Sequence, residues 1–190
     1  CVIGDMAVMK DSYVTSEGRN VALEIYAEEK DIPKCKIAME ALKHSMRWDE
    51  EHYGLPYDLD NYIIVATSAF NMGAMENKGL NIFNTSCVLA DEEYTTDAAI
   101  MRVQSVIAHE YFHNWTGNRI TCRDWFQLCL KEGLTVFRDQ SFSEDLQSAA
   151  VQRIDDVAVL KAHQFPEDSG PLSHPPRPDH FVEINNFYTA

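Results

Sequence analysis

His109-Glu110-Tyr111-Phe112-His113, followed after eighteen further residues by Glu132, is the stretch that decides how this chain is built. Two histidines four residues apart on a helix project from the same face, where both imidazoles can hold one zinc ion. Glu110 is offset by one position from His109, which places its carboxylate beside the ion, where it can deprotonate a metal-activated water. A third protein ligand would leave one of four coordination positions open, as in catalytic zinc sites. The sequence therefore predicts one Zn²⁺ and a hydrolytic reaction.

Glu132 is the candidate for the third ligand. It lies four residues after Leu128 and four before Val136, so it shares their apolar helical face and should point inward. Burying an unpaired carboxylate is costly, and a metal ion removes that cost. A salt bridge to Arg138 is the competing explanation. Asp139, two turns further on the same face, is a candidate partner for a ligand histidine, with solvent exposure as the alternative.

The segments around this pattern predict strands first and helices afterwards. Strands are expected at residues 2–9, 13–14, 21–25, 62–66 and 80–88. Helices are expected from Pro33 to Gly54, from an N-cap at Asp97 to Gly117, and from Glu144 to His163. A further helix is expected to start at an N-cap at Asp124. Its inward face would consist of Trp125, Leu128, Cys129 and Val136. Residues 166–178 hold five of the seven prolines and predict a stiff loop. This order predicts an α+β fold.

The composition narrows the classes of partner. The chain has 190 residues, 45% of them hydrophobic and 24% charged, which is ordinary for a globular protein of one generous domain or two small ones. A formal net charge of −14 argues against nucleic acid or an anionic membrane surface as partner. It suits a cationic ligand such as an α-ammonium group, although acidic surfaces also keep proteins in solution. No apolar run approaches the about 18–20 residues that span a bilayer.

The cysteines and the chain ends bear on the cellular location of the protein and on whether the chain is a piece of a longer one. The five cysteines are odd in number and lack CxxC spacing: Cys1, Cys35, Cys87, Cys122 and Cys129. This predicts reduced thiols and a cytoplasmic location. Zinc ligation by Cys122 or Cys129 is an alternative that the sequence favours less than packed thiols. The chain starts at Cys1 rather than at methionine and stops at Ala190. We expect a piece of a longer protein, in which a signal peptide would be hidden by the cut start.

A second motif, Gly73-Ala74-Met75-Glu76-Asn77, stands upstream of the HExxH pattern. Together the two motifs and Glu132 closely resemble the signature of the aminopeptidase N family of zinc metallopeptidases, within the gluzincin clan. The likeness continues through Trp115-Thr116-Gly117-Asn118-Arg119, Asp124-Trp125-Phe126-Gln127 and Lys131-Glu132-Gly133-Leu134-Thr135, and it covers nearly the whole chain. It is strongest to the bacterial alanyl aminopeptidases.

The resemblance implies how a peptide would bind. In the family, the glutamate that matches Glu76 pairs with the free α-amino group of the substrate, and the backbone of Gly73, Ala74 and Met75 lies along the substrate like a neighbouring strand. Glycine removes a side chain where two backbones approach closely. Met72 resembles the residue that lines the pocket for the first side chain, with core packing as the alternative. The implied substrate-binding set is Met72, Gly73, Ala74, Met75, Glu76 and Asn77.

The resemblance also implies a fold and a domain plan. It is that of a thermolysin-like catalytic domain, with a small mixed sheet packed on a helical half. Residues 1–28 would join an upstream β-domain, and residues 29–190 would form the catalytic domain, with a helix and sheet part at 29–95 and a helical part at 96–190. The family's oxyanion-stabilising tyrosine would lie beyond Ala190, since Tyr188 matches a different, structural aromatic. We therefore expect this piece to bind zinc and to turn over poorly on its own.

The leading prediction is a zinc-dependent aminopeptidase that removes the N-terminal amino acid by metal-activated water attack on the first peptide bond. His109, His113 and Glu132 would hold the metal, and Glu110 would act as base. The partners would be peptides with a free N-terminus and the flanking domains. An endopeptidase would gain nothing from Glu76, and epoxide hydrolysis, which a branch of the broader family performs, has no special support here. A zinc-stabilised interaction module would have no use for Glu110.

Overall fold

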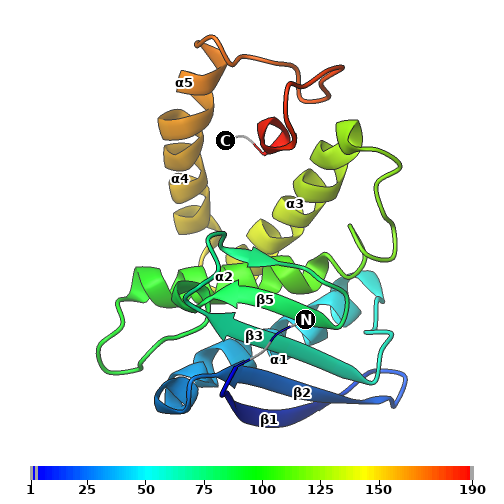
Figure 1. Ribbon diagram of the computed structural model, residues 1–190, viewed down its shortest axis with the longest axis vertical. Helices are drawn as coiled ribbons and strands as arrows, with labels where there is room; N and C mark the ends of the chain where they lie inside the picture. Colours follow the sequence, from blue (N-terminus) through cyan, green and yellow to red (C-terminus); the bar gives the residue numbers. More distant parts are fainter. Residues whose placement is uncertain (1, 3, 189–190) are drawn as a thin grey trace.

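A five-stranded mixed sheet forms one layer of the computed structural model, which describes residues 2 and 4–188 (Figure 1). Its strands are β1 (Ala7–Val14), β2 (Asn20–Ala27), β3 (Asn61–Thr67), β5 (Leu80–Asn84) and β4 (Ala74–Met75), in that spatial order. β1 and β2 form an antiparallel hairpin, β2, β3 and β5 run parallel, and β4 pairs with β5 antiparallel. β4 is therefore an edge strand of the described sheet.

The hairpin forms because an alternating apolar pattern follows a glycine turn. Three alternating side chains of β2 have no exposed surface: Val21, Leu23 and Ile25. Gly18 turns the chain with a φ of 82°, a left-handed value that glycine adopts without steric cost. The predicted strand start at Val2 is wrong, because β1 begins at Ala7. Ala7 pairs with Ala27, the last residue of β2, so the ladder ends there.

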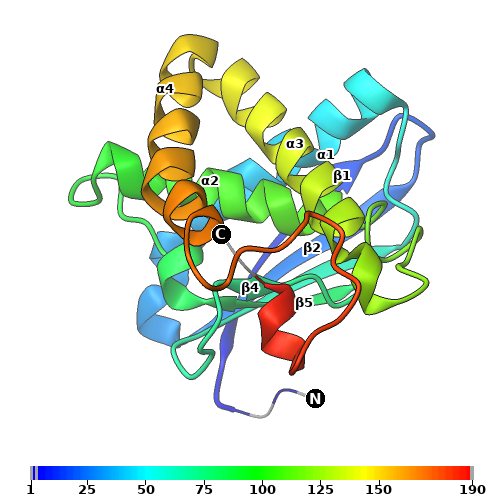
Figure 2. The ribbon, with the colours of Figure 1, turned by 90° about the horizontal axis from the view of Figure 1, so that it is seen from above.

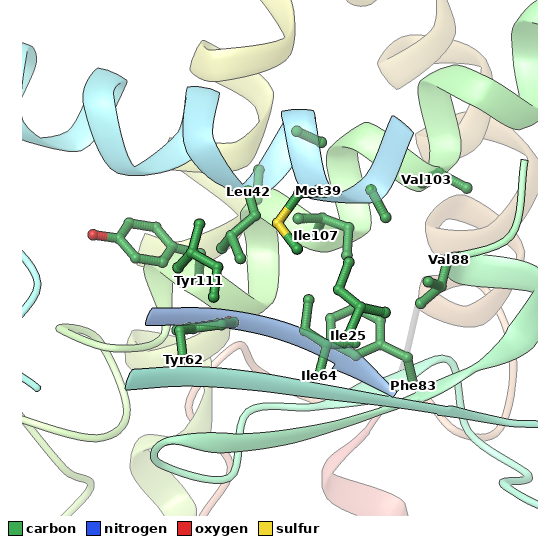
Figure 3. Close-up of a cluster of buried hydrophobic side chains, with 14 of the residues drawn as sticks. Ile25, Met39, Leu42, Tyr62, Ile64, Phe83, Val88, Val103, Ile107 and Tyr111 are labelled. Atoms are coloured by element: carbon green, nitrogen blue, oxygen red, sulfur yellow. The ribbon is translucent and has the colours of Figure 1, made fainter. Parts of the chain in front are cut away.

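Helices α1 (Lys36–Tyr53) and α2 (Asp97–Phe112) pack on the sheet (Figures 1 and 3). The core between them combines side chains from both layers: Ile25, Ile64 and Phe83 from the strands, Met39 and Leu42 from α1, and Val103 and Ile107 from α2. Burying a side chain such as Ile107 stabilises the fold by about 1.5–3 kcal/mol. This packing fixes α2, the helix that carries the histidines.

The second half of the chain is helical (Figures 1 and 2). A 3₁₀ turn (Trp125–Gln127) leads into α3 (Leu128–Leu146), followed by α4 (Ala149–Val159), a π-helical turn (Leu160–Gln164) and α5 (Phe165–Asp168). The chain then returns to the start of α3, where Phe181 and Phe187 contact the ring of Phe126. Short 3₁₀ turns also occupy Glu29–Cys35, Thr85–Cys87 and Ile184–Phe187. The order of strands and helices confirms the predicted α+β fold.

Helix α1 follows the prediction closely, whereas both ends of α2 differ from it. α1 ends where Gly54 adopts the left-handed conformation and donates to the carbonyl oxygen of Glu50. The N-cap of α2 is Thr96 rather than Asp97, and its side chain accepts a hydrogen bond from the backbone N–H of Ala99 at 3.3 Å. α2 stops at Phe112, before the predicted Gly117, because the chain turns back in a hydrogen-bonded loop.

In the helical half, the helices begin and end at positions that differ from the prediction. α3 continues past Glu144, where a separate helix was expected, and the break falls at residues 147–148. Asp124 does not cap α3, since its carboxylate accepts from the guanidinium of Arg123 at 3.0 Å instead. Trp125 and Val136 are exposed rather than inward-facing. Pro166 lies in the first turn of α5, which begins at Phe165 within the predicted loop, because the first helical turn tolerates a missing N–H. The strand predicted to Val88 ends at Asn84, opposite the last residue of β3.

The structure tests only part of the predictions about the thiols, membrane spans and domain boundary. The described cysteines, Cys35, Cys87, Cys122 and Cys129, are free thiols, and Cys1 lies outside the described residues. Among the described helices, none has the length and apolar character to cross a membrane. The boundary at residue 28 stays a prediction about the whole protein, although β2 on one side of it pairs with β3 on the other.

Candidate metal centre

The two histidines of the HExxH pattern lie at the C-terminal end of α2, where His109 occupies the last turn and His113 the C-cap. Their Nε2 atoms are 3.0 Å apart, and their rings are perpendicular, at 88°. The Nδ1 of His113 lies 2.8 Å from the carbonyl oxygen of Thr116. A carbonyl oxygen only accepts hydrogen bonds, so Nδ1 of His113 donates to it, and Nε2 is the ring nitrogen that faces His109.

Glu132 of α3 completes a triangle of ligand atoms. Its Oε2 lies 3.4 Å from Nε2 of His109 and 3.3 Å from Nε2 of His113. Zinc holds nitrogen and oxygen ligands at about 2.0–2.2 Å in a tetrahedron, whose corners are then about 3.3–3.6 Å apart. Two edges of the triangle match this size and the third, at 3.0 Å, is slightly shorter. The donor set and its dimensions therefore fit one zinc ion.

The electrostatics of Glu132 agree with a ligand role. Burial opposes its charge, but hydrogen bonds from His109 and His113 hold the pKa of Glu132 well below its usual range. The competing salt bridge to Arg138 is wrong, because that guanidinium pairs with Asp49 of α1. Groupings of possible ligands in the described part of the chain contain histidines and glutamates, and Cys122 and Cys129 are not among them.

Glu110 lies beside the triangle with its carboxylate buried. Its Oε2 has no hydrogen-bond partner among the described residues. An unpaired buried carboxylate oxygen is costly and indicates a place for a ligand or a water. Burial raises the pKa of Glu110 to about 7, although the charges of His109 and His113 oppose this. A base whose pKa is close to neutral is suited to proton transfer at neutral pH.

Asp139 orients His109, as the sequence predicted. Its Oδ2 lies 2.6 Å from Nδ1 of the imidazole, and both side chains are largely buried. Burial alone would lower the pKa of His109, but the hydrogen bonds to Asp139 and Glu132 outweigh it and raise the pKa to about 10. The Nδ1 proton therefore points to Asp139, which leaves Nε2 facing Glu132 and His113.

We expect Asp139→Ala to weaken zinc binding by about 10–100-fold, the usual effect of removing the partner that orients a ligand histidine. Competition with a chelating dye measures the affinity in this chain. Asp145→Ala is the matched control, because Asp145 lies on the same helix and bonds Trp48 instead. Equal zinc affinity in the Asp139 variant and the control would remove Asp139 from the metal centre.

The predicted anchor Glu76 follows β4 and is buried, in a loop held on two sides. Its carbonyl oxygen accepts a hydrogen bond from the side-chain amide of Asn118 at 2.9 Å. The backbone N–H of Asn84 donates to the carbonyl oxygen of Gly73 at 2.8 Å. One carboxylate oxygen of Glu76 lies within 4.8 Å of ligand atoms of both Glu110 and His113. The structure therefore brings the two predicted motifs together.

Lys131 is a residue of the site that the sequence reasoning did not single out. Its ammonium group pairs with Oε1 of Glu76 and lies 3.0 Å from Oε1 of Glu132. Burial would lower its pKa, but hydrogen bonds to the two carboxylates outweigh this and raise the pKa above its usual range. Gly117 makes room for its stem, since a Cβ at this position would lie 3.2 Å from Cδ of Lys131. The signal in the sequence was its place next to Glu132 in the family-like stretch Lys131-Glu132-Gly133-Leu134-Thr135.

The other predicted contacts lie at the surface of the loop. Met72 is 56% exposed, so the alternative of core packing is wrong for it. Met75 and Asn77 are also exposed, and Ala74 is half-buried. At Gly73, a Cβ would meet Sγ of Cys87 at an ordinary 3.9 Å and no other described residue within 4 Å, so the described part of the chain does not require glycine there. Tyr188 lines a cavity that Glu132 also lines.

The family of the chain follows from comparison with known proteins. The model described as the peptidase family M1 domain matches residues 37–190, which is most of the chain. This chain belongs to peptidase family M1. The resemblance to the aminopeptidase N family is thereby confirmed.

Within family M1, the chain is similar to bacterial members over its whole length. It is 58% identical to aminopeptidase N of Caulobacter vibrioides over 189 residues, 100% of this chain and 22% of that relative. It is 59% identical to aminopeptidase N of Escherichia coli over 188 residues, 99% of this chain and 22% of that relative. The chain thus spans about a fifth of the length of these curated relatives.

A solved structure supports the same placement. The chain superposes on the crystal structure of Legionella pneumophila aminopeptidase A in complex with aspartic acid with a TM-score of 0.86 and 37% sequence identity. The match covers 98% of this chain and 21% of that chain. The mixed sheet and the helices of this chain are therefore an M1 fold.

Proposed function

We propose that this chain carries the zinc-dependent active site of an aminopeptidase that removes the N-terminal amino acid from peptides. The main observation in support of this proposal is the position of the Glu76 carboxylate. Its buried carboxylate lies within 4.8 Å of ligand atoms of Glu110 and His113. An α-ammonium group bound to Glu76 would leave room for a single residue before the metal, so only the first peptide bond would reach it.

His109, His113 and Glu132 would hold the zinc ion, which when bound polarises the substrate carbonyl and makes water easier to deprotonate. Residues of the chain itself transfer the proton and orient the ligand histidine. Glu110 takes a proton from the attacking water and passes it to the leaving amine. Asp139 keeps the imidazole of His109 in the required tautomer through its 2.6 Å hydrogen bond.

The edge strand β4 supports binding of an extended peptide. β4 pairs with β5 on one side and ends the described sheet on the other. A substrate backbone can add there as a further strand, with main-chain hydrogen bonds to Ala74 and Met75. The described residues leave room for a side chain at Gly73, and the absence of one would allow that close approach of the substrate backbone. The exposed Met72 would contact the first side chain.

Lys131 supports the choice of an amine as the ligand of Glu76. A lysine ammonium is the same chemical group as a protonated peptide N-terminus, and it already pairs with one oxygen of this carboxylate. The bound Lys131 also keeps Glu76 ionised: burial opposes the charge, but His113 and Lys131 hold the pKa of Glu76 below its usual value. An incoming amine would use the second carboxylate oxygen.

A cavity of about 560 Å³ next to Glu132 would take the rest of the peptide. It lies between α3 and the segment that follows α5 and returns to the start of α3, and its wall includes Leu128, His174, Phe181 and Tyr188.

The activity is proposed for the whole protein. Flanking domains would be partners of this chain, and residues 1–28 would be the junction to the upstream domain. A cytoplasmic location is likewise proposed, from the free thiols, and cell fractionation tests it: recovery outside the cytoplasm would reject it.

We expect Glu76→Gln to lower kcat/KM for alanyl p-nitroanilide by roughly 10–150-fold, since a charge-assisted hydrogen bond to the ammonium contributes about 1.5–3 kcal/mol. The assay uses a full-length protein that contains this chain. Glu92→Gln is the control, because Glu92 is an exposed glutamate that pairs with Lys36. The zinc content should not change in either variant.

The N-acetylated substrate separates this function from its competitors. The wild-type protein should cleave the free amine and leave the acetylated compound intact, and a chelator should abolish the reaction. Equal cleavage of both compounds would favour an endopeptidase and reject Glu76 as anchor. Zinc binding without cleavage of either would reject the enzymatic proposal.

A further inference from the structure

Two buried charges meet near the metal centre without binding any of its ligands. Asp49 of α1 has no exposed surface and Arg138 of α3 is 6% exposed. One Nη atom of Arg138 pairs with Asp49, and the other donates to the carbonyl oxygen of Phe112 at 3.1 Å. The guanidinium also lies 4.7 Å from the ring centre of Phe112. A single side chain therefore joins α1, the last residue of α2 and α3.

The position of this junction relates it to the metal centre. Phe112 directly precedes the ligand His113, and Arg138 directly precedes Asp139, which holds His109. Thr135, one turn earlier on α3, lies 3.1 Å from Nδ1 of His113. Several contacts between α2 and α3 around the histidines are thus polar and directional, beside the ring contact of Phe112 with Phe142 at 5.9 Å. Directional contacts fix a relative position, which apolar packing alone does less strictly.

The pair is poorly suited to stabilising the fold. Burial raises the pKa of Asp49 to about 6 even though Arg138 opposes this, which shows how strongly the site disfavours the charge. Oδ2 of Asp49 and Nε of Arg138 have no hydrogen-bond partner in the described part of the chain. Replacing such a pair with apolar side chains of similar volume is often neutral or stabilising. The buried pair is therefore better explained by a role other than stabilising the fold.

We propose that Arg138 and Asp49 are positioning residues of the metal centre. They set the approach of α3 to the last turn of α2, and thereby place Glu132 and Asp139 relative to the two histidines. The planar fork of arginine suits this task, because its two Nη atoms hold two acceptors in fixed directions. The inference rests on the zinc site of the proposed function, but not on the aminopeptidase reaction.

The test separates fold stability from metal binding in this chain. We expect the double variant Asp49→Leu/Arg138→Met to be at least as resistant to urea as the wild type without zinc. Its zinc affinity, measured by competition with a chelating dye, should fall about 10-fold, the lower end of the effect of outer residues on metal sites. With Co²⁺ as probe, its visible absorption bands should change shape. Unchanged affinity and an unchanged Co²⁺ spectrum would overturn the proposal.

A second variant keeps the test decisive. Arg138→Lys retains a positive charge opposite Asp49 but cannot hold Asp49 and the Phe112 carbonyl in one rigid fork. It should show the same loss of zinc affinity, whereas wild-type affinity would contradict the positioning role. If neither variant folds without zinc, the pair serves stability and the proposal is rejected.

The control neutralises an exposed pair of the same residue types. Arg19 and Asp60 lie 2.8 Å apart at the surface, Arg19 in the turn between β1 and β2 and Asp60 just before β3. Arg19→Gln/Asp60→Asn should bind zinc like the wild type, and a matching loss there would overturn a specific role of the buried pair. Absence of zinc binding in the wild type would reject the proposed function as well. Normal zinc binding in all variants would reject this inference alone.

Discussion

The Glu110→Gln variant is expected to bind zinc as tightly as the wild type and to lose about 10²–10⁴-fold in kcat, the usual contribution of a general acid–base group. Glutamine has nearly the same shape as glutamate but cannot accept a proton. The buried Oε2 of Glu110 has no partner among the described residues, so the substitution breaks no hydrogen bond that this oxygen makes. Its effect should therefore appear in the chemical step, with KM little changed.

The measurement combines steady-state kinetics on alanyl p-nitroanilide with zinc content by atomic absorption, in the full-length protein. Glu40→Gln is the control, since Glu40 is an exposed glutamate on α1 whose side chain lies 3.8 Å from Lys43. The acid limb of the wild-type profile should lie at or below pH 7, because burial raises the pKa of Glu110 to about 7 and the charge of a bound zinc ion would lower it from there. The rate falls as pH falls through that value, since the base becomes protonated. Wild-type turnover in Glu110→Gln would remove Glu110 as the base.

The local parts of the site could be predicted because helix geometry alone determines them. Two histidines at a spacing of four lie on one face of any α-helix, and Glu110 follows from the same geometry. Asp139 was reached by counting turns from Glu132, and its hydrogen bond to His109 confirms that step. The helix end at Gly54 is local as well, because glycine adopts the left-handed conformation without strain.

The inward direction of Glu132 was predicted for a reason that holds only in part. Leu128 is buried, as expected of the apolar face, but Val136 is 38% exposed and does not continue it. The carboxylate points inward because two imidazoles and the ammonium of Lys131 surround it, at 3.0–3.4 Å. Polar partners, rather than an apolar stripe, orient this side chain.

The pairs that connect distant segments could not be predicted from the sequence. Lys131 and Glu76 are 55 residues apart, and Arg138 and Asp49 are 89 residues apart. No periodicity links such positions, because only the packing of α1, α2 and α3 brings them together. The strand ends were missed for a similar reason, since β1 can extend only as far as its partner β2 does.

The Glu132→Ala variant is expected to lose zinc binding by at least about 100-fold. Structural zinc sites bind with about 10–16 kcal/mol from four ligands, so one ligand contributes roughly 3 kcal/mol. The loss should exceed this share, because Glu132 is the ligand that brings a negative charge, whereas imidazole binds zinc in its neutral form. Dialysis of the chain against a zinc buffer, followed by atomic absorption, measures the bound metal.

The thermal midpoint provides a second, independent readout of the same variant. A ligand that binds only the folded state stabilises it, so a chelator should lower the Tm of the wild type and leave that of Glu132→Ala unchanged. Glu144→Ala, the same substitution further along α3, should respond to the chelator like the wild type. Zinc retained by Glu132→Ala at the wild-type level would show that the third ligand is another residue. Glu76 or Glu110 would then be the next candidate, because both place a carboxylate oxygen within 4.8 Å of a ligand atom of His113.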